Sequence, residues 1–302
     1  MKYSGWQVIR QALTGNNGWK RLWREPEPKS SYDIIVVGGG GHGLSTAYYL
    51  SNVYGLTNIA VLEKGWLGSG NVGRNTTIIR SNYMMPGNEP FYEFSMKLWE
   101  NLEQDFNFNA MVSQRGIINL FHSDPQRDAF ARRGNAMRMS GADAVLLDQQ
   151  DIRELCPYLD FENARFPIMG GLQQSRGGTV RHDAVAWGYA RGADRRGVDI
   201  IQACEVEGFQ IENGQCTGVE TSRGPISAKK VAVCVAGSSS RVMAKAGMRL
   251  PIEAEWTRAA RGDGNNKWPW GVTLPDKFEG KASLEALRLF RSKDKANKPV
   301  GT

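Results

Sequence analysis

The sequence predicts an α/β fold, because signals for a strand, a tight turn, a helix and a second strand follow one another between residues 32 and 64. An apolar run over 34–37 leads into a glycine cluster, then an apolar-periodic segment, then a second apolar run ending at Glu63. The glycines have the spacing Gly38-x-Gly40-x-x-Gly43. In this pattern the first glycine permits the turn, the second lets backbone approach a pyrophosphate and the third lets helix and strand pack closely. The unit is therefore expected to bind a dinucleotide.

The alternative without a ligand is a flexible glycine turn in an ordinary α/β domain, since four consecutive glycines raise the chance that the Gly-x-Gly-x-x-Gly spacing arises by accident. The flanking strands and helix favour the dinucleotide site. Glu63 follows Gly43 by 20 residues, where its carboxylate can accept both hydroxyls of a ribose. The pattern does not separate FAD from NAD, whereas the carboxylate argues against the 2′-phosphate of NADP.

Composition limits the other classes of protein. The 302 residues suffice for one large or two moderate domains, and 41% hydrophobic with 23% charged residues is ordinary for a globular protein. No apolar run approaches the roughly 20 residues of a membrane span. The four cysteines lack CxxC spacing, which favours free thiols in a reducing compartment, hence the cytoplasm, over two long-range disulfides. Three distant histidines predict no metal site.

A net charge of +7 is compatible with nucleic-acid binding, which would require the positive charges to form a binding face. Residues 1–30 carry six Lys/Arg against two Asp/Glu, and residues 254–302 carry ten against six. The body between them carries 22 against 23 and is close to neutral. A basic binding face is therefore not expected, and neither is nucleic acid as a partner.

Residues 1–30 form an amphipathic, basic, tryptophan-bearing arm without the apolar core of a secretory signal. We expect either a docking arm for a partner subunit or a plain helix that packs on its own domain.

A polar, glycine-rich loop follows Glu63 over residues 65–83, and loops of this length are often functional. Arg74 and Arg80 stand out in it, and solvated arginines are the alternative interpretation. Further on, the patterns predict helices over 89–106, about 124–139 and the second half of 176–197, a strand over 116–121, a short helix capped by Asp148, and a hairpin at Asn213-Gly214.

Taken together, these blocks resemble the flavin-dependent amine oxidases of the D-amino-acid oxidase type, and most closely the beta subunits of heterotetrameric sarcosine oxidases. The resemblance spans about residues 1–253 and rests on IVVGGGGHGLSTAYYL, AVLEKGWLGSGNVGRNTTIIRSNY, SQRGIINL and GGTVRHDAVAWGYAR, continuing to LPIE. It implies non-covalent FAD bound by Gly38, Gly40, His42, Gly43, Glu63 and Lys64, with Asn71, Arg74 and Thr76 near the flavin and the backbone of Val206 near the adenine.

The resemblance further implies that His182 carries a covalent FMN and that Arg80 holds the substrate carboxylate. Gly177, Gly178 and Thr179 would let that cofactor approach, and a solvent-exposed helix-terminal histidine is the alternative. The implied reaction oxidises sarcosine or a similar N-methyl amino acid by hydride transfer to FAD. Oxygen then yields hydrogen peroxide, and the one-carbon unit reaches tetrahydrofolate. The implied partners are alpha, gamma and delta subunits.

The expected domains are an arm (1–30), a discontinuous FAD-binding domain of Rossmann type (31–88 and 148–250), part of an α+β substrate domain (89–147) and a divergent tail (251–302). The family continues past LPIE with further substrate-domain strands and a glycine-rich block, and residues 254–302 match neither. A truncated chain with an incomplete substrate domain is therefore expected. A flavin-binding or docking remnant without turnover is the rival function, and an NAD-dependent dehydrogenase is a weaker third.

Overall fold

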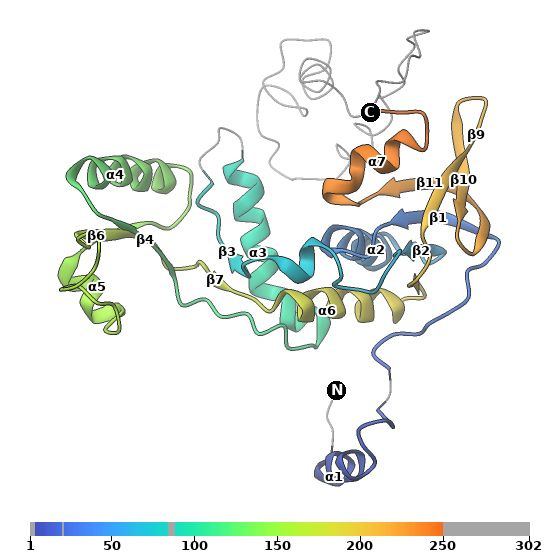
Figure 1. Ribbon diagram of the computed structural model, residues 1–302, viewed down its shortest axis with the longest axis horizontal. Helices are drawn as coiled ribbons and strands as arrows, with labels where there is room; N and C mark the ends of the chain where they lie inside the picture. The colour runs from blue at the N-terminus through green and yellow to red at the C-terminus, as the bar shows by residue number, and fades with distance from the viewer. Residues whose placement is uncertain (1–3, 20, 84–87, 250–302) are drawn as a thin grey trace.

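The computed structural model describes residues 4–19, 21–83 and 88–249 (Figure 1). The predicted tail over 251–302 lies outside these residues. In chain order the elements are α1 (Gly5–Leu13), β1 (Ser31–Val37), α2 (Gly41–Tyr54), β2 (Ile59–Leu62), η1 (Asn71–Arg74), β3 (Ile78–Ile79), α3 (Glu89–Phe106), β4 (Ile117–Phe121), α4 (Asp124–Met139), β5 (Val145–Asp148), α5 (Gln149–Leu155), β6 (Gly170–Gln174), β7 (Gly178–Thr179), α6 (His182–Asp194), β8 (Asp199–Ile201), β9 (Val206–Glu212), β10 (Gln215–Thr221), β11 (Gly224–Val233), η2 (Ala236–Ser238) and α7 (Ser239–Ala244).

The larger sheet has six strands in the order β8-β2-β1-β11-β10-β9. The first four are parallel; β10 pairs antiparallel with β11, and β9 pairs antiparallel with β10. All four residues of β2 are buried, because both faces of the parallel part are covered. The predicted βαβ unit is β1, α2 and β2, which confirms the α/β fold.

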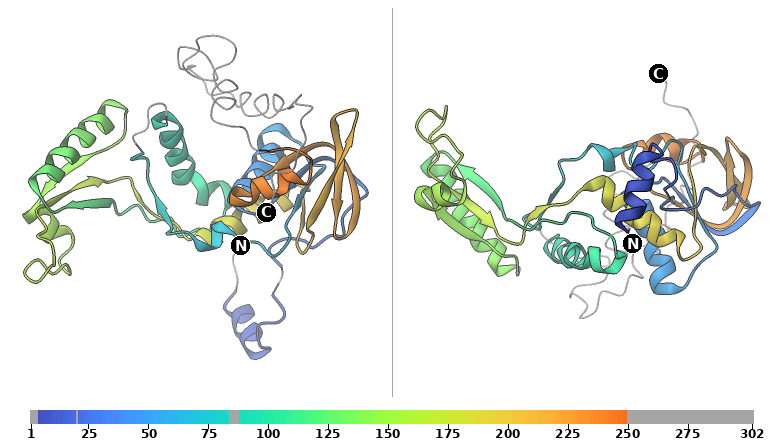
Figure 2. Two further views of the ribbon diagram at one scale, coloured as in Figure 1. Left: turned by 45° about the horizontal axis from the view of Figure 1, so that its top comes forward. Right: turned by 90° about the horizontal axis from the view of Figure 1, so that it is seen from below.

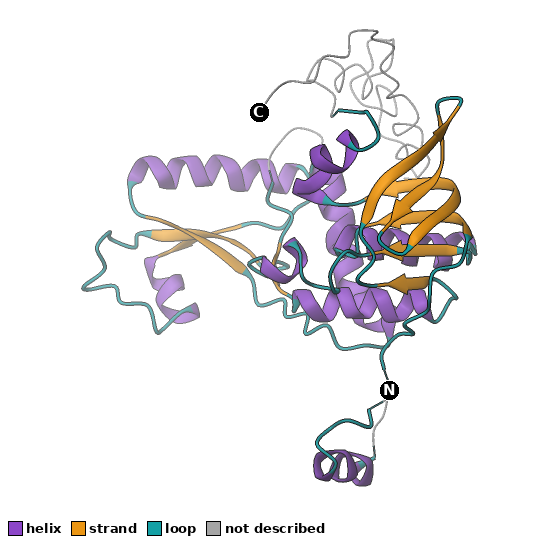
Figure 3. Cartoon of the chain, turned by 45° about the vertical axis from the view of Figure 1, so that its right-hand side comes forward, coloured by secondary structure: helices purple, strands orange, loops and turns teal. Residues whose placement is uncertain are grey.

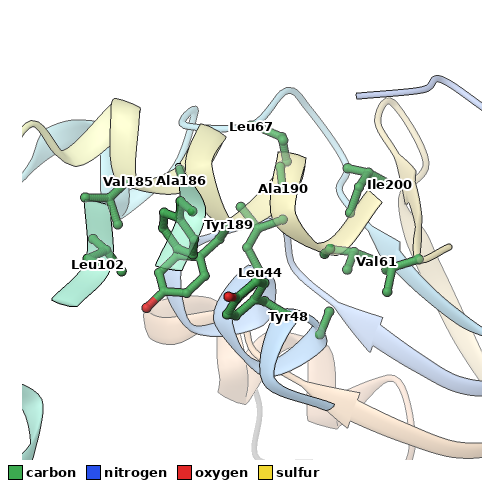
Figure 4. Packing of buried hydrophobic residues seen from close by; sticks show 14 of the residues in the cluster. Leu44, Tyr48, Val61, Leu67, Leu102, Val185, Ala186, Tyr189, Ala190 and Ile200 are labelled. Atoms are coloured by element: carbon green, nitrogen blue, oxygen red, sulfur yellow. The ribbon is translucent and has the colours of Figure 1, made fainter. Parts of the chain in front are cut away.

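Two helices, α2 and α6, pack beside each other against one face of this sheet (Figure 4). The ring of Tyr48 lies edge-on to Phe106 and Tyr189, at centroid distances of 5.2 and 5.6 Å. A Cβ on Gly192 would come within 2.8 Å of the Tyr48 ring, so the missing side chain lets the helices approach. This core holds the start of α2 in place.

A smaller antiparallel sheet has the order β4-β6-β5 and carries α4 and α5 (Figures 1 and 2). Its middle strand, β6, belongs to the segment 148–250, which the sequence assigns to the FAD-binding domain. The domain boundaries remain a prediction, and this pairing indicates where the two units interleave. An antiparallel ribbon of β3 and β7 lies between the sheets.

Most local expectations are confirmed. The helix over 89–106 and the helix over 124–139 have the predicted bounds. Asp148 caps α5 in a reciprocal capping box with Asp151. Asn213 and Gly214 both have positive φ, of 49° and 70°, as a tight hairpin between right-twisted strands requires.

The helix α1 projects away from both sheets (Figures 1 and 3). Ser4 caps it by accepting a hydrogen bond from the Gln7 N–H. Within the described residues, no helix is long and apolar enough to cross a membrane.

Candidate active site

The glycine turn between β1 and α2 has the geometry that its spacing predicts. Gly38 has φ of +107°, in the region that favours glycine. A Cβ on Gly43 would lie 1.9 Å from the Gly38 carbonyl oxygen, so no other residue fits there without moving the backbone. A Cβ on Gly40 would meet nothing within 4 Å. The turn is therefore closely packed at two positions and open at the third.

The start of α2 offers donors beside this open position. Gly40 is the N-cap and provides no side-chain hydrogen bond, so the first N–H groups of the helix lack a capping side chain. Such N–H groups and the positive end of the helix dipole favour a phosphate. His42 is exposed in this first turn. The residues present therefore fit the pyrophosphate of a dinucleotide.

Glu63 directly follows β2 and links the glycine turn to the end of this strand. Its two carboxylate oxygens accept hydrogen bonds from the Gly39 N–H at 2.8 Å and the Gly65 N–H at 2.9 Å. Each carboxylate oxygen has further acceptor capacity for a ribose hydroxyl. Lys64 beside it is exposed. The structure thus brings the predicted glycines and the predicted acid together.

The loop after Glu63 runs past the start of α2. Gly41 lies near the Val72 side chain, which packs on the main core, and a Cβ on Gly41 would be 3.7 Å from it. The predicted residues Asn71, Arg74 and Thr76 are all exposed on this loop. Their side chains are thus accessible to a ligand beside the turn.

Arg80 follows β3 and is partly buried. Its Nε donates to the Tyr83 hydroxyl at 3.3 Å, and its guanidinium carbon lies 4.9 Å from the centre of the Tyr83 ring. Tyr83 stacks on Tyr92 of α3 with centroids 4.4 Å apart. Among the described residues, the two Nη groups of Arg80 have no hydrogen-bond partner. A guanidinium can pair with a carboxylate through two of its donors.

The segment after Arg80 is held by residues that the sequence did not mark as functional. Ser81 and Asn82 are buried, and the amide of Gln174 binds Ser81. The sequence contained an indication that Gln174 is buried: it lies two residues beyond the apolar Leu172 in a strand, so both side chains point to the same, inward face.

Val206 and His182 lie outside the glycine turn. Val206 begins β9, is buried, and its carbonyl accepts from the Lys245 ammonium at 2.9 Å. His182 begins α6 and is partly buried, and its Nδ1 is buried without a hydrogen-bond partner among the described residues. An unsatisfied ring nitrogen fits an attachment point for a flavin, which would engage it.

The glycines before His182 have a packing explanation. A Cβ on Gly178 would lie 2.0 Å from the Ser113 carbonyl oxygen, and one on Gly177 would lie 2.7 Å from the Ile117 side chain. These contacts account for both glycines through close packing, against a side chain at Gly177 and against backbone at Gly178, so the glycines by themselves do not indicate a cofactor.

Next to His182, Arg181 makes two hydrogen bonds to Asp183, at 2.8 and 3.0 Å. These bonds lower the pKa of the Asp183 carboxyl below its ordinary value. The four cysteines are free thiols. In the described part of the chain, no group of three or more His, Cys, Asp or Glu side chains could hold a metal ion.

Comparison with known proteins identifies the family. The model of the FAD dependent oxidoreductase family matches residues 33–277. The chain is 66% identical over 272 residues to sarcosine oxidase subunit beta of Rhizobium meliloti (strain 1021), covering 90% of this chain and 65% of that protein. Its identity to the subunit of the same name from Rhodobacter capsulatus is 47%, over 84% of this chain and 61% of that one.

Among solved structures, L-proline dehydrogenase from P. horikoshii is similar with a TM-score of 0.69 at 26% identity, over 75% of this chain and 59% of that one. The chain spans less than two thirds of the length of these curated relatives. The matching model covers both the glycine turn and the loop that carries Arg80. The chain belongs to the FAD dependent oxidoreductase family.

Proposed function

We propose that this chain binds FAD non-covalently and oxidises sarcosine or a similar N-methyl amino acid as the beta subunit of a heterotetrameric sarcosine oxidase. The observation that carries the proposal is the open glycine turn, with Glu63 fixed beside it and Arg80 on the following loop. The relatives named sarcosine oxidase subunit beta support the choice of substrate class.

Each predicted residue has a proposed part in holding FAD. Gly38, Gly40 and Gly43 shape the turn for the pyrophosphate, and Glu63 accepts the ribose hydroxyls. The other proposed contacts are His42 and Lys64 near the adenosine half, the backbone of Val206 at the adenine, and Asn71, Arg74 and Thr76 at the flavin end.

Arg80 is proposed to bind the substrate carboxylate. A guanidinium holds a carboxylate through two parallel hydrogen bonds, which fixes the direction of the substrate as well as its position. FAD, when bound, supplies the acceptor for the hydride. In the proposed overall reaction, the two electrons taken from sarcosine would reduce oxygen to hydrogen peroxide, and the oxidised methyl carbon would pass to tetrahydrofolate and leave glycine.

His182 is proposed as the attachment point of a covalent FMN. The support is its buried Nδ1, which has no hydrogen-bond partner in the described part of the chain. A buried ring nitrogen without a partner is costly, and a bond to a flavin would remove that cost.

Partner subunits, alpha, gamma and delta, are proposed to assemble with this chain, and α1 is proposed to dock on one of them. Its apolar stripe is exposed: Trp6 by 74%, Ile9 by 52% and Leu13 by 82%. A helix of nine residues is marginal in water unless an apolar face is covered. Because no described residue packs on this stripe, we propose that the surface of a partner subunit does.

The segment between α1 and β1 is held to the main domain by ion pairs. This attachment favours a helix α1 with a defined position, as a docking role requires. Arg24 pairs with Asp194 at 2.8 Å, and Lys29 pairs with the buried Asp199 at 2.8 Å. The Tyr32 hydroxyl also donates to Asp199 at 3.1 Å, and burial raises the pKa of Tyr32 to about 12. We further propose a cytoplasmic location, which suits the free thiols.

The test is to express the chain with the alpha, gamma and delta subunits and to purify the assembly. Flavin absorbance and anaerobic bleaching by sarcosine should both be present. Purified assembly without flavin would refute FAD binding. Bound FAD that sarcosine does not reduce would instead identify the chain as a flavin-binding or docking remnant without turnover.

The same assembly tests the arm. Trp6→Ser combined with Leu13→Ser should release the chain from its companions, measured as molar mass by light scattering, while FAD stays bound. Gln7→Ala, on the polar side of the same helix, is the matched control and should leave the assembly intact. An unchanged mass for the double variant would rule out the docking role.

A further inference from the structure

Directly after Arg80, the chain buries two polar residues; burial of a polar group is costly unless its hydrogen bonds are satisfied, as those of the Ser81 hydroxyl are. Ser81 is 1% exposed and Asn82 is 2% exposed. Arg80 lies at the entrance to this buried segment, so whatever fixes Ser81 also fixes where the backbone of Arg80 lies.

Gln174, at the end of β6, holds Ser81 from one side. Its Oε1 accepts from the Ser81 N–H at 3.0 Å, and its Nε2 donates to the Ser81 Oγ at 2.6 Å. The same Nε2 donates to the Asp143 carboxylate at 3.2 Å. Gln174 is 1% exposed, and both its donor and its acceptor atoms are engaged. An apolar side chain of the same size could make none of these bonds.

Glu93 of α3 holds Ser81 from the other side, because the Ser81 hydroxyl donates to its Oε1. Its second oxygen accepts from Arg176 Nη1 at 2.7 Å. The backbone N–H of Arg176 donates to Asp143 at 2.8 Å. The loop is thus clamped between α3 and the end of β6 by a connected set of charge-assisted bonds.

The side chain of Arg80 is oriented from the same helix. Tyr92, which precedes Glu93 in α3, stacks on Tyr83, and Tyr83 accepts the hydrogen bond from Arg80 Nε. One helix turn therefore supports both the guanidinium, through two rings, and the backbone beside it, through Glu93.

We propose that Gln174 and Glu93 are positioning residues for Arg80. By holding Ser81 from opposite sides, they set the direction in which the Arg80 fork meets the carboxylate of the substrate. This inference rests on the proposed role of Arg80, and it adds two residues, from β6 and α3, that do not touch the substrate. The loss of their bonds should weaken recognition of the carboxylate and leave the flavin site intact.

The experiment uses the assembled enzyme and compares kcat/KM for sarcosine and for sarcosine amide, which lacks the carboxylate. Gln174→Met keeps the volume and removes the hydrogen bonds. It should lower kcat/KM for sarcosine about tenfold, through KM, as expected for the loss of buried hydrogen bonds. The value for the amide and the FAD content should stay unchanged. Gln173→Met, at the neighbouring and partly exposed position of β6, is the matched control and should behave as the parent.

A second variant guards against misfolding. Glu93→Gln keeps the shape of the side chain and removes its charge, so it should show the same selective loss for sarcosine. If Gln174→Met and Glu93→Gln both keep the parental kcat/KM for sarcosine, or lower it equally for sarcosine and the amide, the positioning role is wrong.

Arg80→Lys separates this outcome from failure of the proposed function. If that variant retains full activity on sarcosine, the carboxylate clamp is refuted and the positioning role falls with it. If Arg80→Lys loses activity selectively and the Gln174 and Glu93 variants do not, only the positioning role is refuted.

Discussion

Alanine at Gly43 and alanine at Gly40 should damage the protein in different ways, although the two residues belong to the same turn. At Gly43 the added Cβ would lie 1.9 Å from the Gly38 carbonyl oxygen, well inside the 3.0 Å below which real Cβ contacts do not occur. The backbone must therefore shift by about 1 Å, and overpacking of this kind costs about 1–3 kcal/mol. At Gly40 the added Cβ meets no protein atom within 4 Å, and φ of −83° suits alanine.

The midpoint temperature of thermal unfolding of the flavin-free protein should therefore fall for Gly43→Ala, by about 2–4 °C for each kcal/mol of stability lost. It should change little for Gly40→Ala. FAD affinity, measured by quenching of flavin fluorescence, should fall in both. For Gly40→Ala the expected loss is about tenfold to a hundredfold, because the methyl group occupies the space of the pyrophosphate and displaces one or two charge-assisted hydrogen bonds.

If Gly40→Ala binds FAD as tightly as the parent, the pyrophosphate does not approach the backbone there. If Gly43→Ala has parental stability and affinity, the close approach of α2 to β1 is not a constraint on the fold.

Three further expectations concern charge and attachment. Arg80→Lys should raise KM for sarcosine about tenfold to a hundredfold in steady-state kinetics, since lysine cannot form the paired hydrogen bonds; an unchanged KM would contradict the clamp. His182→Ala should leave no flavin attached to the denatured polypeptide, while the native assembly still contains non-covalent FAD; persistence of peptide-bound flavin would exclude His182 as the attachment point. The hydrogen bond from Arg176 lowers the pKa of Glu100 below its ordinary value. A carboxyl whose pKa is depressed by folding stabilises the fold above its unfolded pKa, and this contribution disappears as the pH falls through the lowered value. Arg176→Met should therefore destabilise the protein in urea at neutral pH, and this loss should shrink as the pH is lowered into the acid range; a loss that does not change with pH would contradict the ion pair.

The part of the site that the sequence predicted best is the part that is contiguous in the chain. Gly38, Gly43 and Glu63 lie within one βαβ unit, and local sterics determine which residues fit each position. The Asn213-Gly214 turn was equally local, because it depends on two residues with positive φ.

What the sequence did not indicate depends on contacts between distant segments. Ser81 and Gln174 are 93 positions apart, and their pairing requires β6 to enter the sheet with β4 and β5. Gly178 also depends on a distant contact, because a Cβ there would lie 2.0 Å from the carbonyl oxygen of Ser113. Neither fact follows from composition or periodicity.

The carboxylate of Glu63 has a consequence for how quickly and tightly a ligand can bind. Because the Glu63 carboxylate already accepts hydrogen bonds from the Gly39 and Gly65 N–H groups, the backbone at both glycines is fixed before any cofactor binds. The loss of conformational freedom then accompanies folding and does not oppose association. If Glu63 accepts a ribose hydroxyl as proposed, these two hydrogen bonds set the orientation of the acceptor before the ligand binds.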